Sequence, residues 1–289
     1  MFKKLLLIIG FCYYIPAFAV DWLSYTININ QHQLHYYQGG KGSPVFLLTG
    51  YATTSNFWSK PFVECLASNH TVYLLDYWGV NIDDDTPGNV SIQAMADDSY
   101  QFAKAMKEAN NPVFIGWSMG GAVTQQISFS YDDDIKQAVL ISPLTMNNQP
   151  IANESDEALE HPLTSYNDIL NYVFDNNLYS YNKKQLTKYK RKLFKANEQL
   201  FPDEEITENQ VTAMNDWTSS PVTLRAAKKS DTEYLVFISN QDKMLTPNKT
   251  LSDTKLFKHS KIVKFDGSGH DITLQDPIDS CKQIEEFIK

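Results

Sequence analysis

The sequence predicts an α/β protein in which helices cover both faces of a mostly parallel central sheet and a helical cap is inserted. Three observations predict this class. Short apolar runs without polar alternation recur along the chain, as expected of strands that are buried on both faces. Segments with helical spacing lie between these runs. One long interval contains no comparable run, so it is expected to lie outside the sheet.

The expected strands begin with a hairpin and continue as short apolar segments. Residues 23–29 and 33–38 place β-forming residues around an Asn/Gln-rich turn, which predicts an N-terminal hairpin. The apolar runs that follow occupy residues 45–48, 72–75, 113–115, 138–141, 234–238 and 262–263. Helical spacing is found in residues 92–109, 120–129 and 277–288. Because strands and helices alternate, we expect the crossover connections of a parallel sheet.

Residues 144–209 form the predicted cap, and the core would then comprise residues 20–143 and 210–289. The cap interval is polar and rich in Tyr, Asn, Lys and Glu, with helical patches but no buried strand. Within it, residues 183–195 contain six lysines and Arg191. A solvated helix face is the ordinary interpretation of such a run, and peripheral contact with an anionic membrane surface or an acidic partner is the alternative.

Composition and charge exclude several classes of protein. With 289 residues, 43% of them apolar and 20% charged, the chain has the composition of a folded globular domain rather than of a disordered or multi-span membrane protein. Its formal net charge of -9 disfavours nucleic acid as a partner, because an acidic chain repels a polyanion. The cysteines show neither a C-x-x-C pair nor the Cys/His spacing of zinc ligands, so no metal site is expected.

Residues 1–19 are predicted to be a cleavable secretory signal peptide. Lys3 and Lys4 precede an apolar stretch, and Ala17 and Ala19 fit the A-x-A pattern of a cleavage site. The pattern therefore predicts an exported protein, periplasmic or extracellular. An uncleaved N-terminal membrane anchor and an ordinary buried segment are the alternatives.

The motif G-W-S-M-G-G at residues 116–121 is the strongest local signal for chemistry. It follows the apolar run 113–115 and precedes a helical pattern, so the G-x-S-x-G motif lies between a strand and a helix. A sharp turn of this kind leaves no room for Cβ atoms at Gly116 and Gly120. Ser118 would then lie at a helix N-terminus, which favours negative charge, and is the expected nucleophile.

With this motif, the chain resembles the α/β-hydrolase superfamily from the first apolar run to the C-terminus, apart from the cap. Residues 47–51 (L-L-T-G-Y) are similar to the L-L-H-G-x segment that follows the third strand in that superfamily, with Thr49 in place of the usual histidine. The resemblance implies that the backbone N–H groups of Tyr51 and Met119 form an oxyanion hole.

His270 is the expected general base. It follows the last predicted strand in a glycine-flanked loop, and none of the other five histidines has that setting. Residues 269–277 are also similar to the G-H-x-x-x-x-E-x-P segment of the superfamily.

Asp242 is the expected acid, because it follows the next-to-last predicted strand and precedes the base in the order Ser, Asp, His. Its segment is similar to the strand-G-x-x-D pattern of the superfamily, with Asn240 where glycine is common; asparagine tolerates a left-handed backbone. Asp266 and Asp271 flank the histidine loop too closely in sequence to be the expected acid, and Asp76 precedes the serine, which favours a structural role.

The resemblance thus implies a serine hydrolase that acts on carboxylic esters without a cofactor. Ser118 would attack the carbonyl, His270 would transfer the proton and Asp242 would orient His270. Trp117 makes the turn similar to that of small-ester carboxylesterases, including pimeloyl-carrier-protein methyl esterases, although that substrate is cytoplasmic and the leader indicates export. Lipase, thioesterase, carbon–carbon bond hydrolase and cofactor-free haloperoxidase activities use the same triad, and a catalytically silent ligand-binding relative is a further alternative. The oligomeric state is not predicted.

The resemblance also indicates whether two of the three cysteines can form a disulfide. Cys12 lies in the leader, so export leaves Cys65 and Cys281 as an even pair in an oxidising compartment. In the superfamily, the two helices that would contain them cover the same face of the sheet. The resemblance therefore allows a disulfide without requiring one.

Overall fold

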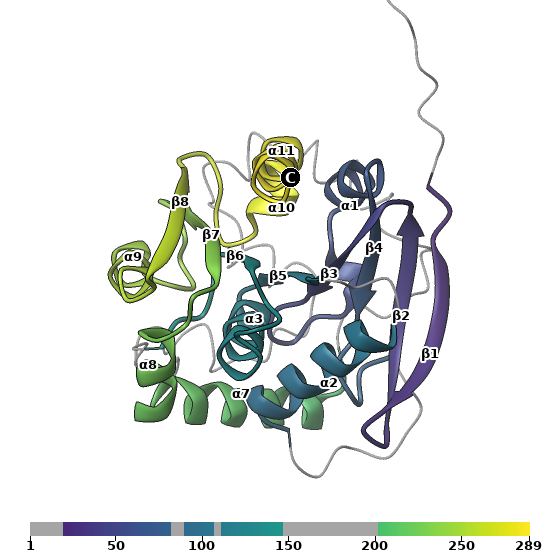
Figure 1. Cartoon of the computed structure of the whole chain (residues 1–289), viewed down its shortest axis with the longest axis horizontal. Coiled ribbons are helices and arrows are strands. Elements are labelled where there is room, and N and C mark those ends of the chain that lie inside the picture. Colours follow the sequence, from purple (N-terminus) through teal and green to yellow (C-terminus); the bar gives the residue numbers. More distant parts are fainter. Residues whose placement is uncertain (1–19, 82–89, 107–110, 147–201) are drawn as a thin grey trace, which may run out of the picture.

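The structure, a computed structural model, describes residues 20–81, 90–106, 111–146 and 202–289 (Figure 1). These residues form an eight-stranded sheet with the order β1-β2-β4-β3-β5-β6-β7-β8. The strands are β1 (Leu23–Ile29), β2 (His32–Gly40), β3 (Ser43–Leu48), β4 (His70–Leu75), β5 (Val113–Trp117), β6 (Gln137–Ile141), β7 (Glu233–Ser239) and β8 (His259–Phe265). β2 pairs antiparallel with β1 and β4, and every pair from β4 to β8 is parallel. The predicted fold class is confirmed.

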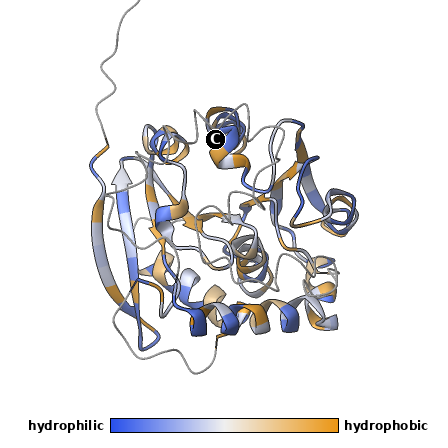
Figure 2. Ribbon diagram, turned by 180° about the vertical axis from the view of Figure 1, so that it is seen from behind, coloured by the Kyte–Doolittle hydropathy of each residue, from blue (hydrophilic) through white to orange (hydrophobic). Residues whose placement is uncertain are grey.

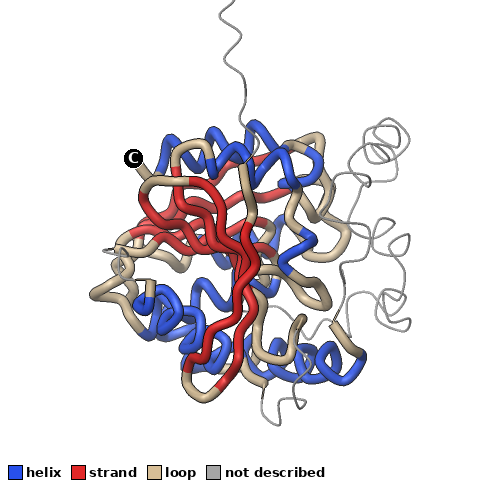
Figure 3. Tube along the Cα trace, turned by 90° about the vertical axis from the view of Figure 1, so that its right-hand side faces the viewer, coloured by secondary structure: helices blue, strands red, loops and turns tan. Residues whose placement is uncertain are grey.

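Helices cover both faces of this sheet (Figure 1). One face is covered by α1 (Lys60–Ala67), α10 (Ile272–Gln275) and α11 (Pro277–Phe287), and the other by α2 (Ile92–Ala105), α3 (Met119–Ser130) and α7 (Glu204–Thr218). The described helices also include α8 (Pro221–Ala227), α9 (Pro247–Thr254) and the short 3₁₀ helix η1 (Ser55–Phe57). Seen from the side, the sheet twists between the two helical layers (Figure 3).

Alternating side chains of the central strands pack into two separate cores. In β3, Phe46 and Leu48 belong to the core beneath α2 and α3, while Val45 and Leu47 belong to the core beneath α1 and α11. All four side chains are buried. Both faces of the strand are therefore removed from water, which explains the unbroken apolar run, and Figure 2 shows the same concentration of apolar residues along the strands.

The N-terminal hairpin lies at one edge of the sheet, as the sequence predicts. β1 and β2 are in register from Leu23 opposite Gln38 to Ile29 opposite His32. The turn between them is made by Asn30 and Gln31, both with positive φ, as tight hairpin turns require. Among the described strands, β1 pairs only with β2.

Some predicted boundaries differ from the structure, and others lie outside the described residues. The helix predicted over residues 92–109 ends at Ala105, where Met106 leaves the helical backbone conformation. The leader (residues 1–19) and most of the predicted cap, with its basic segment 183–195, lie outside the described residues. At the C-terminal end of the cap interval, α7 begins at Glu204 and buries its apolar face in the core beneath α2. Within the described part of the chain, no helix is long and apolar enough to cross a membrane.

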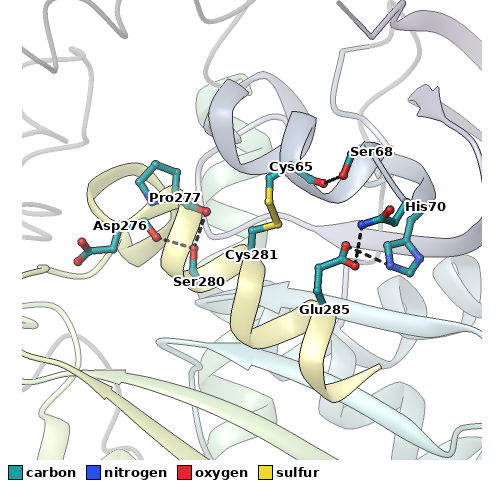
Figure 4. The surroundings of a disulfide bond; sticks show 9 residues. Cys65, Ser68, His70, Asp276, Pro277, Ser280, Cys281 and Glu285 are labelled. Atoms are coloured by element: carbon teal, nitrogen blue, oxygen red, sulfur yellow. Dashed lines mark hydrogen bonds and ion pairs between the residues drawn. A yellow bond between two sulfur atoms is a disulfide. The ribbon is translucent and has the colours of Figure 1, made fainter. Parts of the chain in front are cut away.

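A disulfide joins Cys65 in α1 to Cys281 in α11, with the two Cα atoms 6.3 Å apart (Figure 4). The two helices pack side by side on one face of the sheet, as the family resemblance implied. Near the end of α11, Glu285 contacts His70 at 3.2 Å and accepts a hydrogen bond from the Asn69 side chain at 3.1 Å. The bond and these polar contacts fix α11 against the segment that leads into β4.

Candidate active site

Ser118 lies at the sharp turn between β5 and α3. Its backbone adopts φ 54° and ψ -117°, a conformation that is costly for a residue with a side chain. A Cβ at Gly116 would lie 2.1 Å from the carbonyl oxygen of Gly120, and a Cβ at Gly120 would lie 2.1 Å from that of Leu48. The glycines therefore permit the close packing of α3 against β5 and β3, as the sequence predicts.

Backbone hydrogen bonds hold this strained turn in place. The N–H of Ser118 donates to the Ile141 carbonyl at 3.0 Å, and its own carbonyl accepts from the N–H groups of Gly121 at 2.9 Å and Leu144 at 3.0 Å. The hydroxyl makes no helix-capping hydrogen bond, and the residue is partly exposed. The turn thus fixes the backbone while leaving Oγ for chemistry.

His270 and Asp242 form a buried hydrogen-bonded pair. Nδ1 of His270 lies 2.8 Å from Oδ2 of Asp242, and the two side chains are only 3% and 4% exposed. The other carboxylate oxygen, Oδ1, accepts from the backbone N–H groups of Met244 at 2.8 Å and Leu245 at 2.9 Å. A carboxylate held in this way accepts from Nδ1–H, so neutral His270 presents Nε2 as its proton acceptor.

Trp117 links the histidine loop to the nucleophile turn. Its indole N–H donates to the backbone carbonyl of His270 at 3.1 Å. On its other side, the indole stacks on Phe57 of η1, with ring centroids 5.1 Å apart. Because Trp117 immediately precedes Ser118, this buried side chain fixes the position of His270 relative to Ser118. From the sequence, Trp117 could be assigned only a family likeness, since no neighbouring residue indicates its distant carbonyl partner.

Ser118 and His270 make no direct hydrogen bond to each other among the described residues. The structure therefore brings Asp242 and His270 into contact and places Ser118 beside them through Trp117. Without substrate, hydrogen bonds between nucleophile and base are often long and shorten only in the complex.

The predicted oxyanion donors lie on two segments that meet at Ser118. A Cβ on Gly50 would lie 3.2 Å from Cβ of Ser118, so the loop containing Tyr51 lies against Ser118. Met119 is the first residue of α3, and N–H groups of a first helical turn have no partner within the helix. In the same loop, the hydroxyl of Thr49 contacts that of Thr53 at 2.6 Å, an internal contact at the position where histidine is usual.

Residues distant in sequence support this oxyanion loop. The N–H of Ala52, which has φ 53°, donates to the side-chain oxygen of buried Gln210 at 2.9 Å. The Tyr51 hydroxyl contacts the Thr207 side chain, and burial raises the pKa of Tyr51. Both partners lie on α7, so this helix positions the loop. The sequence analysis missed these residues because their spacing carries no sign of a contact across more than 150 residues.

Asp76 is buried and has a structural role near the same loop. Its carboxylate accepts from the backbone N–H and the hydroxyl of Ser55, the latter at 2.9 Å. It also accepts from the Asn81 amide at 2.7 Å and contacts Nδ1 of His35 at 2.7 Å. The carboxylate therefore holds the start of η1, immediately after the oxyanion loop.

The acids that flank the histidine loop have other partners. Asp271 caps α10, accepting from the Thr273 hydroxyl at 2.7 Å and the Leu274 N–H at 3.1 Å, and its complete burial raises its pKa to about 6. Asp266 accepts from the side-chain amide of Asn240. Asn240, which stands where glycine is common, does not have a positive φ, so its tolerance of a left-handed backbone is not used in this loop.

The described residues contain no group of three or more His, Cys, Asp or Glu side chains placed to hold a metal ion. Near the turn at Ser118, the structure instead shows the imidazole of His270 in contact with the carboxylate of Asp242.

This fold and this turn define an α/β hydrolase. The chain belongs to the α/β hydrolase fold family, which it matches over residues 43–277. Over 111 residues, it is 32% identical to a pimeloyl-[acyl-carrier protein] methyl ester esterase of Yersinia pseudotuberculosis, which covers 38% of this chain and 40% of the relative. It is 27% identical over 109 residues to a putative carbamate hydrolase, RutD, of Azorhizobium caulinodans, again covering 38% and 40%. The chain thus matches less than half the length of these relatives.

Solved structures show the same fold over most of the chain. An α/β hydrolase fold protein from Chitinophaga pinensis superposes with a TM-score of 0.78 and 17% identity, covering 92% of this chain and 97% of that one. An esterase from Thermogutta terrifontis superposes with a TM-score of 0.72 and 18% identity, covering 92% and 98%. At these identities the likeness concerns the fold alone.

Proposed function

We propose that this chain is a serine hydrolase that cleaves carboxylic esters through an acyl-enzyme intermediate. The observation that carries the proposal is the buried His270–Asp242 pair, tethered through Trp117 to the turn that presents Ser118. A serine hydroxyl is a weak nucleophile, and a base oriented by a carboxylate is the arrangement that activates it.

In this mechanism, Oγ of Ser118 forms a bond to the ester carbonyl carbon while Nε2 of His270 takes the hydroxyl proton. Asp242 keeps the proton on Nδ1 and stabilises the imidazolium that forms. The N–H groups of Tyr51 and Met119 stabilise the oxyanion. The alcohol leaves with the proton from Nε2, and water then releases the acid by the same steps in reverse.

The esterase relatives support ester hydrolysis over the other reactions that this triad can perform. One relative is named for a methyl ester, and it is 32% identical to this chain over 111 residues. A carbamate hydrolase among the relatives makes amide-like substrates the second candidate. We therefore expect small carboxylic esters to be the preferred class.

We further propose that the protein is exported. Two basic residues, an apolar stretch and the Ala17–Ala19 pattern support a cleavable leader, and the Cys65–Cys281 disulfide suits an oxidising compartment. The mature chain is then expected to begin at Val20. Sequencing of the N-terminus from the native host tests this: an intact Met1 would indicate an anchor, and recovery from the cytosol would make an acyl-carrier substrate the better proposal.

A panel of p-nitrophenyl esters with graded acyl length tests the activity directly. We expect turnover with the short esters, and acid quenching during turnover should trap an acyl group on the peptide that contains Ser118. Turnover without any acylated peptide would contradict the covalent mechanism. If the chain showed no turnover and a fluorophosphonate did not label Ser118, the protein would be a catalytically silent relative.

A further inference from the structure

Another cluster of Ser, His and Asp side chains lies toward one edge of the sheet, on β1, β2 and the end of β4, and shares no residue with the site at Ser118. Ser24 lies on β1, His35 on β2, and Asp76 immediately follows β4. Oγ of Ser24 lies 2.8 Å from Nε2 of His35, and Nδ1 of His35 lies 2.7 Å from Oδ2 of Asp76. The histidine–carboxylate distance matches the 2.8 Å between His270 and Asp242. A hydroxyl, both ring nitrogens and a carboxylate are thus connected in the order that nucleophile activation needs.

The environment of Asp76 fixes the direction of these hydrogen bonds. Its carboxylate accepts from the Ser55 N–H, the Ser55 hydroxyl and the Asn81 amide, three donors besides His35. Because these donors leave the carboxylate oxygens as acceptors, Nδ1 of His35 donates to Asp76. In neutral His35, the lone pair of Nε2 then faces the hydroxyl of Ser24, which donates its proton to that nitrogen.

In this cluster the carboxylate and the imidazole are buried and the serine is exposed, the arrangement that a reactive serine requires. Asp76 is 1% exposed and His35 is 8% exposed, whereas Ser24 is exposed on the edge strand. The His35 ring packs edge-on against Tyr37 at 4.8 Å, which restricts its rotation. In the strand register, Thr26 lies opposite His35, so Ser24 is a diagonal neighbour within reach of the ring. The base is therefore fixed while the hydroxyl remains accessible to a reagent.

We propose that Ser24 is a second nucleophilic serine, which takes an acyl or phosphonyl group from activated esters and fluorophosphonates. Oγ of Ser24 bonds to the acyl carbon or phosphorus, and Nε2 of His35 accepts the hydroxyl proton. The bond to the leaving group breaks, and the alkoxide or fluoride departs with that proton. The product is a covalently modified Ser24.

Ser24 differs from Ser118 in its backbone setting, and this difference determines the expected rate. Ser118 lies at the N-terminus of α3, where free N–H groups stabilise developing negative charge, whereas Ser24 lies within a strand. The modification of Ser24 is therefore slower than that of Ser118, and the adduct accumulates instead of turning over. This makes Ser24 a modification site rather than a second hydrolytic centre.

The experiment uses the exported chain with Ser118→Ala, which removes the faster nucleophile. This protein is treated with a fluorophosphonate, digested, and analysed by peptide mass spectrometry. We expect a phosphonyl adduct on the peptide that contains Ser24. Ser260 supplies an internal control, because it is an exposed serine on β8, the strand at the opposite edge of the sheet. Labelling of Ser24 no greater than that of Ser260, or none at all, would overturn the proposal.

Matched substitutions test the role of His35. In the Ser118→Ala background, His35→Gln should slow labelling of Ser24 by about 100-fold, as expected for loss of a general base. His32→Gln is the control, since His32 lies on the same strand and pairs with Asp98 at 2.6 Å; it should leave the rate within about twofold. An unchanged rate in His35→Gln would overturn the proposal. If His35→Gln failed to fold, the Ser24 to Ser260 labelling ratio would still decide. Labelling of Ser118 in the unsubstituted chain tests the proposed esterase separately.

Discussion

Breaking the disulfide between Cys65 and Cys281 should markedly lower the stability of the folded protein. The two cysteines are 216 residues apart in sequence, so the bond closes a loop that includes most of the described core. A crosslink over such a span restricts the unfolded chain, and the chain-entropy relation gives about 5 kcal/mol at 25 °C. The polar contacts of Glu285 with Asn69 and His70 remain after reduction, so α11 keeps part of its attachment (Figure 4).

Urea unfolding with and without reductant measures this contribution without any substitution. With a slope of about 3 kcal/mol per M, a difference of about 5 kcal/mol lowers the midpoint by roughly 1.7 M. Circular dichroism follows unfolding, and ester turnover at each urea concentration reports on the active site. We expect the reduced protein to remain active without urea, because packing still holds both helices, and to lose activity at lower urea than the oxidised protein.

A Cys65→Ala chain is the control, since it cannot form the bond and should respond to urea identically with and without reductant. Midpoints of the oxidised and reduced unsubstituted protein that agree within about 0.3 M would refute this reasoning. That result would mean either that the thiols are free or that the crosslink restricts the unfolded chain far less than its span indicates.

Four substitutions near the histidine loop have distinct expected outcomes. Trp117→Phe keeps a ring but removes the donor to the His270 carbonyl, so kcat should fall about tenfold with little change in KM; an unchanged kcat would show that the tether is dispensable. Asp242→Asn should lower turnover near neutral pH by up to about ten-thousandfold, because the amide favours the wrong tautomer of His270. Asp266→Asn is the control and should lower turnover only slightly; the reverse pattern would mean that the acid is misassigned. For Asp271, a folded pKa of about 6 against 3.8 means that the folded chain keeps a proton which the unfolded chain releases, so stability falls as pH rises through this window. Asp271→Asn removes the titrating group, so the variant does not lose this stability. Measured by urea unfolding, the free energy of unfolding of the variant minus that of the unsubstituted chain should rise by about 2 kcal/mol from pH 4.5 to 7.5. A difference that does not change with pH would contradict the raised pKa of Asp271.

The central strands could be predicted from the sequence because each is buried on both faces. In β3, successive side chains enter different cores, so the strand has to be apolar throughout. The sharp turn at Ser118 could be predicted for a similar local reason: at Gly116 and Gly120, a Cβ would collide with backbone atoms. The apolar run and the glycine motif each occupy neighbouring positions in the chain, so both can be recognised from the sequence.

The supporting contacts could not be predicted, because they join residues that only the fold brings together. Gln210 binds Ala52 across the molecule, and the Trp117 indole binds a carbonyl that has no sequence signature of its own. Asp76 could be identified as structural, but its connection to His35 depends on the antiparallel pairing of β2 with β4. Asn240 stands where glycine is common, but its backbone has no positive φ, a fact that the residue type alone does not indicate.

Ester turnover by Ser118→Ala tests the central claim most directly, because the hydroxyl is the one group that the substitution removes. Ser118 is only partly buried and makes no helix-capping contact, so the variant should fold normally, as thermal unfolding can verify. We predict that kcat for a p-nitrophenyl ester falls at least about a thousandfold relative to the unsubstituted chain. A folded Ser118→Ala variant that retains more than about a tenth of the activity would contradict the account.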